Sequence, residues 1–299
     1  MATNKLGKQL LKVGRHLRRY SGLEAELIAR RKSSEAALSL DKQSQLRLLM
    51  DYRERAARGG PLPEFQETEF RSWSQHGEDG LLLFLFGVVG FGSRRSVEMC
   101  CGDGLECNSA NLIIHHAFRS LLVDARTKKL ARGRAFYEQC KECRPNRPIL
   151  LESWITRDGV DPMLTRHGFA GEIDLLSIDL DGMDYWIWEA VTVAEPRVVA
   201  IEYNAKWPAH RSLTVPYQDD FVCHDRYRGA SLAALVKLGR RKGYRLVGCQ
   251  RGQVNAFFVR DDLAPDLLPE IDAADCLGLR LLSDEEQQAT LQREEWVEV

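Results

Sequence analysis

The sequence predicts an α/β sandwich with a mostly parallel sheet of about seven strands, preceded by an N-terminal helical segment. Three observations favour this class. Short apolar runs alternate with helical patterns from about residue 70 onward. A glycine turn joins one of these strands to the following helix. Near the end, apolar runs at 244–248 and 254–259 flank Arg251-Gly252, which predicts an antiparallel hairpin closing the sheet.

The chain is organised around one strand–turn–helix–strand unit, SVEMCCGDGLECNSANLIIHHAFRSLLVDA. Its successive parts are a strand at 96–100, a turn at 101–104, a helix at 108–118 and a strand at 121–123. Glycines in such a turn let the backbone approach a ligand at the carboxyl ends of parallel strands. Asp124 ends the second strand, where a carboxylate is placed to accept hydrogen bonds from ribose hydroxyls.

The charge of this turn indicates which nucleoside it favours. It lacks the G-x-G-x-x-G pattern, and Asp103 stands where it would repel a pyrophosphate. Glu98 and Asp103 would instead attract a cationic nucleoside. S-adenosylmethionine carries a positive sulfonium and no phosphate, and is therefore the cofactor we expect. A nucleotide-dependent oxidoreductase fits this acidic turn less well, and a solvated acid cluster without a ligand is the simpler alternative.

Length and composition set the organisation of the chain. Its 299 residues allow one large domain with an appendage, and a net charge of −1 gives no case for nucleic-acid binding. A break at Gly59-Gly60-Pro61-Leu62-Pro63 predicts a domain boundary. We expect an N-terminal helical segment at 1–60, a main domain at 61–270 and a C-terminal tail at 271–299.

Eight cysteines without regular spacing, including one lone C-x-x-C at Cys140 and Cys143, predict free thiols in a reducing cytoplasm. A structural zinc site would need two further ligands at suitable spacing. Neither a signal peptide nor a stretch of ~20 apolar residues is visible. These observations favour a cytoplasmic protein, with contact at the inner membrane surface as an addition.

The N-terminal segment has the pattern of basic amphipathic helices. An apolar stripe at helical spacing is formed by Leu6, Leu10, Val13, Leu17 and Tyr20. The surrounding lysines and arginines suit packing on the chain's own main domain, self-association or an anionic membrane surface. A second helix is expected over 42–57, with Leu46, Leu49 and Met50 on one face.

The remaining elements follow in order. The polar stretch from Ser74 to Asp79 precedes a helix at Leu81–Val89, and is more polar than helix capping requires, so Gln75 and its neighbours are expected to line a cofactor cleft. Ser153 and Trp154 follow the third strand, where adenine would lie. Further helices are expected at 127–139, 185–191 and 230–242, and further strands at 148–151, 174–180 and 197–203, with Pro196 ending the region before the last of these.

Acidic residues follow two strands that we expect to be neighbours. Asp179, Asp181 and Asp184 end the fourth strand, and Glu202 and Asn204 end the fifth. Clustered carboxylates repel one another unless they are protonated or bridged by a cation. Oxygen ligands from Asp179, Asp181, Glu202 and Asn204 would suit magnesium or another hard divalent cation. The alternative is that one acid binds the cofactor, one caps the next helix and the rest are solvated.

A long polar segment, residues 205–228, is expected near the cleft, because structureless loops of this length are usually functional. It supplies three candidate general bases, Lys206, His210 and His224, and His76 is a fourth. The residues that we favour for the chemistry are His224, Lys206 and Asp181.

Six motifs now support a resemblance. They are SQHGEDG at 74–80, SVEMCCGDG at 96–104, LLVDA at 121–125, DLLSIDLDGMDYWIWEA at 174–190, VVAIEYN at 198–204, and GASLAALVKLGRRKGYRLVGC with VNAFFVRDDL further on. Over about residues 70–263 the chain resembles the FkbM-like branch of class I S-adenosylmethionine-dependent methyltransferases. The resemblance implies a Rossmann-like fold. The chain departs from the family pattern at Cys100, where glycine is usual.

The resemblance also implies roles and an activity. Glu98, Gly102 and Gly104 would form the cofactor turn, Asp124 would hold the ribose hydroxyls, and Asp179 would face the methionine end or a metal. Members of the family are similar to enzymes that methylate hydroxyls, so the expected acceptor is a sugar, glycan or glycosylated natural product. The alternative is a non-catalytic methyltransferase-like scaffold, which Cys100 and the N-terminal helices favour.

Overall fold

The computed structural model describes residues 40–223, 227–278 and 281–299. The chain divides into two compact units, Met1–Arg47 and Leu48–Val299. The predicted boundary at Gly59–Pro63 falls within the second unit, which holds all the elements discussed below. The amphipathic stripe expected at residues 6–20 lies outside the described residues.

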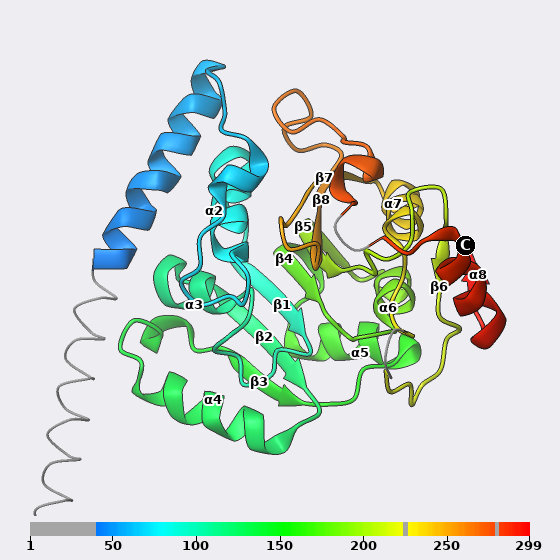
Figure 1. The fold of residues 1–299 in the computed structure, drawn as a ribbon. Coiled ribbons are helices and arrows are strands. Elements are labelled where there is room, and N and C mark those ends of the chain that lie inside the picture. Colours follow the sequence, from blue (N-terminus) through cyan, green and yellow to red (C-terminus); the bar gives the residue numbers. More distant parts are fainter. Residues whose placement is uncertain (1–39, 224–226, 279–280) are drawn as a thin grey trace, which may run out of the picture. The chain divides into compact units, whose positions relative to one another are not determined.

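The second unit is built on a seven-stranded sheet with the order β3-β2-β1-β4-β5-β8-β7 (Figure 1). The strands are β1 (Arg95–Met99), β2 (Arg119–Asp124), β3 (Ile149–Glu152), β4 (Gly171–Ile178), β5 (Ala194–Glu202), β7 (Tyr244–Cys249) and β8 (Asn255–Arg260). Strands β1 to β5 pair in parallel, and β8 is antiparallel to both β5 and β7. This order and these directions confirm the predicted Rossmann-like class I methyltransferase fold with its closing hairpin.

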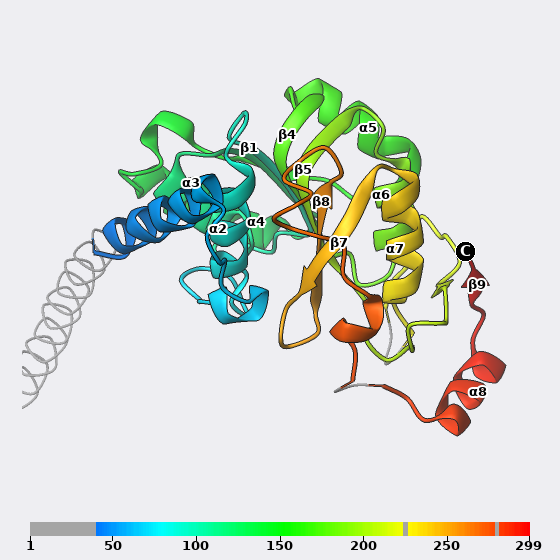
Figure 2. The same cartoon turned by 90° about the horizontal axis from the view of Figure 1, so that it is seen from above.

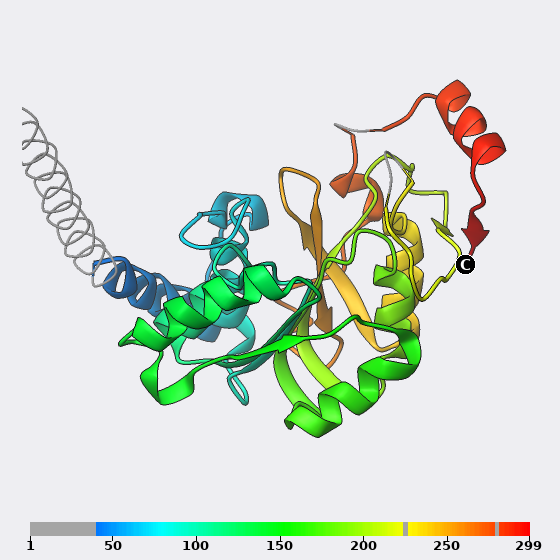
Figure 3. The same cartoon turned by 90° about the horizontal axis from the view of Figure 1, so that it is seen from below.

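Helices cover both faces of this sheet, as Figure 2 and Figure 3 show. One layer contains α2 (Glu78–Val89), α3 (Ala110–His116) and α4 (Thr127–Gln139), and the other contains α5 (Arg157–His167), α6 (Asp184–Ala190) and α7 (Leu232–Arg241). Successive residues of a strand point to opposite faces. In β5, Val199 and Ile201 therefore join one buried cluster, while Val198 and Ala200 join the other. Burial on both faces explains why the strands read as continuous apolar runs.

The described part of the unit also contains shorter elements: the 3₁₀ turns η1 (Phe65–Thr68), η2 (Arg144–Asn146) and η3 (Ala273–Cys276), helix α8 (Asp284–Arg293), and a small antiparallel pair of β6 (Leu213–Thr214) and β9 (Val297–Glu298). The C-terminal tail, residues 271–299, thus contains helix α8. Its last strand pairs with the polar segment 205–228, which is therefore not structureless.

Three expectations about elements were wrong. Helix α5 was not predicted, because Gly159 and Pro162 weaken its pattern, but Thr156 caps it by accepting a hydrogen bond from the Gly159 amide. Pro196 lies inside β5 rather than before it. Met50 is exposed, whereas Leu49 and Tyr52 are the buried positions within residues 48–58.

Within the described helices, none combines the length and the apolar character that crossing a membrane would require.

Gly80 in α2 permits a very close backbone approach. A Cβ atom there would lie 2.0 Å from the Thr68 carbonyl oxygen and 2.4 Å from the Phe70 nitrogen. We expect Gly80→Ala to lower the free energy of unfolding by about 3 kcal/mol, because backbone atoms have little room to move. Denaturant unfolding checks this. Gly60→Ala, whose nearest non-adjacent atom would be 3.7 Å away, is the matched control. Equal stability of the two variants would contradict the tight packing.

Candidate active site

The site lies at the carboxyl ends of the parallel strands, where the strand order reverses between β1 and β4. The turn after β1 uses left-handed backbone at Cys100, Gly102 and Gly104, with φ of 67°, 64° and 73°. The Cys101 amide donates to the Val123 carbonyl oxygen at 3.0 Å, which ties the turn to β2.

Helix α4 supports this turn from behind. Gly133 leaves no room for a side chain, since its Cβ would lie 2.1 Å from the Asp103 carbonyl oxygen. The Tyr137 hydroxyl donates to the Gly104 carbonyl at 2.5 Å, and Arg132 pairs with the Asp103 carboxylate. Burial raises the pKa of Asp103, but the hydrogen bond from Arg132 and other donors outweighs it, so the pKa is lowered. Asp103 therefore faces α4 and lines neither cavity described below.

Glu98, near the end of β1, fixes the start of the α3 region. Its buried carboxylate accepts hydrogen bonds from the amides of Asn108 at 2.8 Å and Ser109 at 2.6 Å. Burial raises the pKa of Glu98 despite these donors. Glu98 also lines the larger cavity, so it both orders the loop and contributes negative charge to the site.

Asp124, at the end of β2, is buried and fully hydrogen-bonded. It accepts from the Gly102 amide at 2.8 Å, the Arg126 amide at 2.8 Å, and the Arg126 guanidinium at 2.8 and 2.6 Å. Burial raises its pKa, but the Arg126 hydrogen bonds are stronger in sum and hold the pKa below its usual value. The Arg126 side chain is half exposed, whereas the Asp124 side chain is 1% exposed.

Two cavities meet at Cys100. The larger is about 440 Å³ and polar; the smaller is about 100 Å³ and largely apolar. The larger is lined by six carboxylates, Glu78, Glu98, Glu106, Asp179, Asp181 and Glu202, and three cations, Arg126, Lys129 and Arg228. Carboxyl groups therefore outnumber cations on this wall, and those that are ionised favour a cationic ligand. The predicted residues Gln75 and Gly102, as well as the candidate base His76, also line it.

The smaller cavity follows the ends of β2, β3 and β4. Its lining includes Asp124, Ser153, Trp154, Leu180 and Phe221. The Trp154 indole donates to the Asp219 carbonyl, which joins the end of β3 to the 205–228 segment. Predicted cofactor residues therefore occur on both cavities, and the apolar one has the character that an adenine ring requires.

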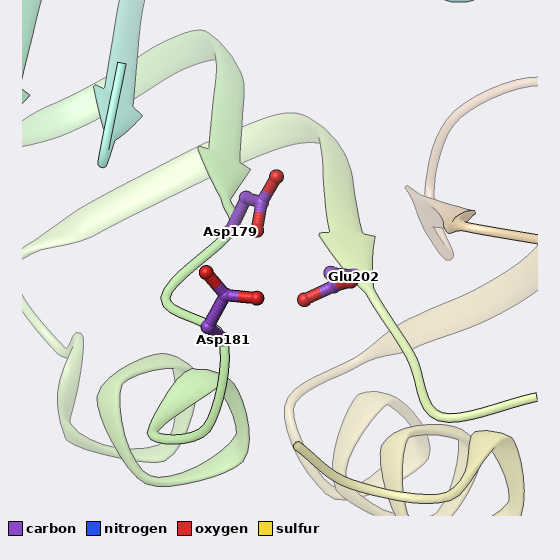
Figure 4. Close-up of side chains that lie close together, drawn as sticks. All are labelled: Asp179, Asp181 and Glu202. Carbon is purple, nitrogen blue, oxygen red and sulfur yellow. The ribbon is translucent and has the colours of Figure 1, made fainter. Parts of the chain in front are cut away.

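An acidic cluster, defined as Asp179, Asp181 and Glu202, lies between the ends of β4 and β5. Figure 4 shows the three carboxyl groups facing a common space. One oxygen from each lies within 4.8 Å of the others. Burial, followed by the neighbouring Asp179 and Asp184, raises the pKa of Glu202 to about 9. Burial and then Asp181 also raise the pKa of Asp179.

Arg228 spans two members of the acidic cluster. Its guanidinium lies 2.9 Å from Asp181 and 3.6 Å from Glu202. One cation thus faces three carboxyl groups, of which Glu202 has its pKa raised to about 9. The donor set, three carboxylates on two strand ends, fits a hard divalent cation.

The side chains of Asp184 and Asn204 form hydrogen bonds with nearby backbone groups instead. Asp184 is buried, accepts from the Leu180 and Gly182 amides at 2.8 and 2.9 Å, and has its pKa raised to about 7 by burial. The Asn204 side chain donates to the Arg228 carbonyl at 2.9 Å and accepts from the Lys206 amide at 3.2 Å. The structure therefore does not bring Asn204 into the acidic cluster.

The candidate bases separate. His76 lines the larger cavity, whereas Lys206 and His210 line neither cavity. His224 lies outside the described residues. Sequence reasoning missed Arg228, Arg126, Asn108 and Asn255 as lining residues. Only their positions in the sequence could have indicated that these residues line the cavity. Asn255 lies in the VNAFF motif, and Arg228 ends the polar segment.

Comparison with known proteins gives only distant structural similarity at low sequence identity. No protein-family profile matches the chain, and no curated protein sequence matches it. Among solved structures, the methyltransferase domain of bacterial CtHen1-C is 16% identical over 61% of this chain and 96% of its own, with a TM-score of 0.40. The N-terminal domain of EvdMO1, with SAH bound, is 11% identical over 70% and 94%, with a TM-score of 0.39. The glycopeptide N-methyltransferase MtfA with sinefungin is 12% identical over 60% and 85%, with a TM-score of 0.37.

Cys100 stores backbone strain at the junction of the two cavities. A non-glycine residue in the left-handed region costs about 1–2 kcal/mol. Glycine avoids this cost but loses more conformational entropy on folding, which offsets part of the gain. We expect Cys100→Gly to raise the free energy of unfolding by about 0.5–1 kcal/mol, measured by denaturant unfolding. Ala117→Gly is the matched control, because Ala117 has φ 59° at the exposed end of α3. A clear loss of stability in Cys100→Gly alone would show that its side chain is needed.

Proposed function

We propose that the chain is an S-adenosylmethionine-dependent O-methyltransferase that acts on a hydroxyl of a sugar, glycan or glycosylated natural product. The observation that carries the proposal is the pair of joined cavities at the point where the strand order reverses, with Asp124 and the Gly102 turn on their walls. No pyrophosphate-binding pattern accompanies them, and the excess of carboxylates supports a cationic ligand.

The residues present fit the cofactor. The smaller apolar cavity would hold adenine near Trp154 and Leu180, and Asp124 would accept the ribose hydroxyls in place of the Arg126 guanidinium. The negatively charged larger cavity would hold the methionine end, with its sulfonium and ammonium groups, next to Glu98. Bound there, S-adenosylmethionine would supply an electrophilic methyl group.

The acceptor would occupy the rest of the larger cavity. Its wall is rich in hydrogen-bonding side chains, among them Gln75, Asn108 and Asn255, which suits a polyhydroxylated molecule. Holding the hydroxyl in line with the methyl group supplies much of the rate enhancement. The acceptor oxygen forms the new C–O bond as the C–S bond breaks, and the sulfur keeps that electron pair.

The hydroxyl proton must leave during this transfer. We assign its removal to His76, because this residue lines the larger cavity from the segment just before α2. A divalent cation held by the acidic cluster would lower the pKa of the acceptor hydroxyl. Either arrangement uses residues of the chain that already face the cavity.

Mass spectrometry of acceptor panels tests the activity. The full chain is incubated with S-adenosylmethionine carrying a labelled methyl group and with neutral sugars, acidic sugars, glycopeptides and simple amines. The proposal expects labelled methyl ethers on a sugar-containing acceptor and none with Asp124→Asn. Methylation of amines in place of hydroxyls would contradict the O-methyl assignment.

A further inference from the structure

The C-x-x-C motif lies at the end of α4, away from both cavities. The sulfur atoms of Cys140 and Cys143 are only 2.7 Å apart. Both side chains are buried and both carry free thiols. A disulfide requires about 2.05 Å between the sulfurs, so a small movement of this turn closes the bond.

A metal site explains this pair less well. Structural zinc needs four ligands, usually cysteine and histidine. Within the described part of the chain, the acidic cluster is the one group of three or more potential ligand residues, and it contains neither cysteine. Within the described residues, Cys140 and Cys143 therefore form a dithiol rather than part of a cluster of metal ligands.

We propose that Cys140 and Cys143 form a reversible disulfide by exchange with a low-molecular-weight disulfide such as oxidised glutathione. The Cys140 thiolate attacks one sulfur of that disulfide and releases one thiolate. The Cys143 thiolate then attacks Cys140 in the mixed disulfide and releases the second. The two protein thiols are oxidised, the external disulfide is reduced to two thiols, and the two protons pass to those thiols.

The surroundings favour Cys140 as the attacking thiol. Cys140 is 8% exposed and Cys143 is 1% exposed. The contact with Cys143 is the main cause that lowers the pKa of Cys140, while the same contact and burial raise the pKa of Cys143. The turn between them carries the exposed Lys141 and Glu142, whose charges cancel, and the exposed Arg144 follows Cys143, so the local charge suits an anionic disulfide.

Helix α4 connects the cysteine pair to the turn at residues 101–104. The same helix places Gly133 against Asp103 and Tyr137 against Gly104. A bond that fixes the end of α4 therefore acts on the element that supports residues 101–104. The disulfide itself does not depend on the proposed function, and the readout below is thiol chemistry.

Peptide mapping of the full chain tests the proposal. Trypsin cleaves after Lys141, so a 140–143 disulfide holds two tryptic peptides together. After treatment with oxidised glutathione and alkylation, we expect this linked pair, and its loss on adding a reductant. Cys143→Ser should instead trap glutathione on Cys140, and Cys140→Ser should give neither product. Buried Cys107 is the internal control.

Three results would overturn the proposal. They are complete alkylation of both cysteines after the glutathione treatment, linkage of either one to a different cysteine, and stoichiometric zinc in the untreated chain. Circular dichroism of each variant guards against misfolding. Because methyl transfer is not measured, failure here leaves the proposed function untouched, and the reverse also holds.

Discussion

Asp124→Asn is expected to weaken binding of S-adenosylhomocysteine by about 100-fold. Hydrogen bonds to a charged acceptor contribute about 1.5–3 kcal/mol each, and the ribose offers two hydroxyl donors. The amide keeps the size of the side chain but loses its charge and turns one acceptor into a donor. Isothermal titration measures the change. Because the variant also loses its ion pair with Arg126, thermal unfolding must show that it is folded.

Arg126→Ala is the matched variant, because it removes the competing guanidinium and keeps the carboxylate. Asp124 would retain the amide hydrogen bonds from Gly102 and Arg126. Only the Arg126 side of this ion pair is exposed, and the Asp124 side chain is 1% exposed. Solvent screening at the exposed side holds the contribution of the pair to about 1 kcal/mol, so binding should tighten by about fivefold. If Arg126→Ala weakened binding as much as Asp124→Asn does, Arg126 would be a ligand of the cofactor rather than its competitor.

Loss of cation binding in Glu202→Gln is the second large effect that we expect. The substitution preserves shape and removes one of three carboxyl groups that share a space, so the site loses the negative charge that Glu202 acquires when a cation displaces its proton. Affinity for Mg²⁺ should fall tenfold or more, since about 1.4 kcal/mol corresponds to a factor of ten. Titration with Mg²⁺, or with Mn²⁺ followed by electron paramagnetic resonance, measures it.

Glu106→Gln is the control for the metal site. Glu106 also lines the larger cavity, but it pairs with Arg71 at 2.8 Å and is not a member of the acidic cluster. Its variant should bind the cation as the parent does. Equal effects of the two substitutions would mean that the cavity attracts cations by its overall charge alone. Activity that survives chelation would remove the metal from the chemistry.

Much of the fold could be predicted because its signals are local. Helix α4 has the predicted bounds Thr127–Gln139, and β1, β2 and the turn between β1 and α3 lie within a residue or two of expectation. The pairing of β6 with β9 joins residues more than eighty positions apart, and no local pattern reports it. Helix α5 was missed because its cap and its packing, rather than its composition, stabilise it.

The candidate site could be predicted in part, where it depends on which strands are neighbours. Neighbouring parallel strands bring their carboxyl ends together, so the meeting of Asp179, Asp181 and Glu202 followed from strand order alone. Asn204 differs because its side chain binds the nearby backbone instead. The ion pairs of Arg126 and Arg228 could not be predicted, because the partner of a long side chain depends on where the fold places the carboxylates.

The most direct test of the central claim is calorimetric titration of the full chain with S-adenosylmethionine and S-adenosylhomocysteine, with and without Mg²⁺, and with NAD as a comparison. The account predicts saturable binding of one S-adenosyl ligand per chain and no binding of NAD. Tight NAD binding would instead place a dinucleotide at the Gly102 turn. If neither S-adenosyl ligand bound and NAD did not bind either, the methyltransferase assignment would be contradicted and a non-catalytic scaffold would be favoured.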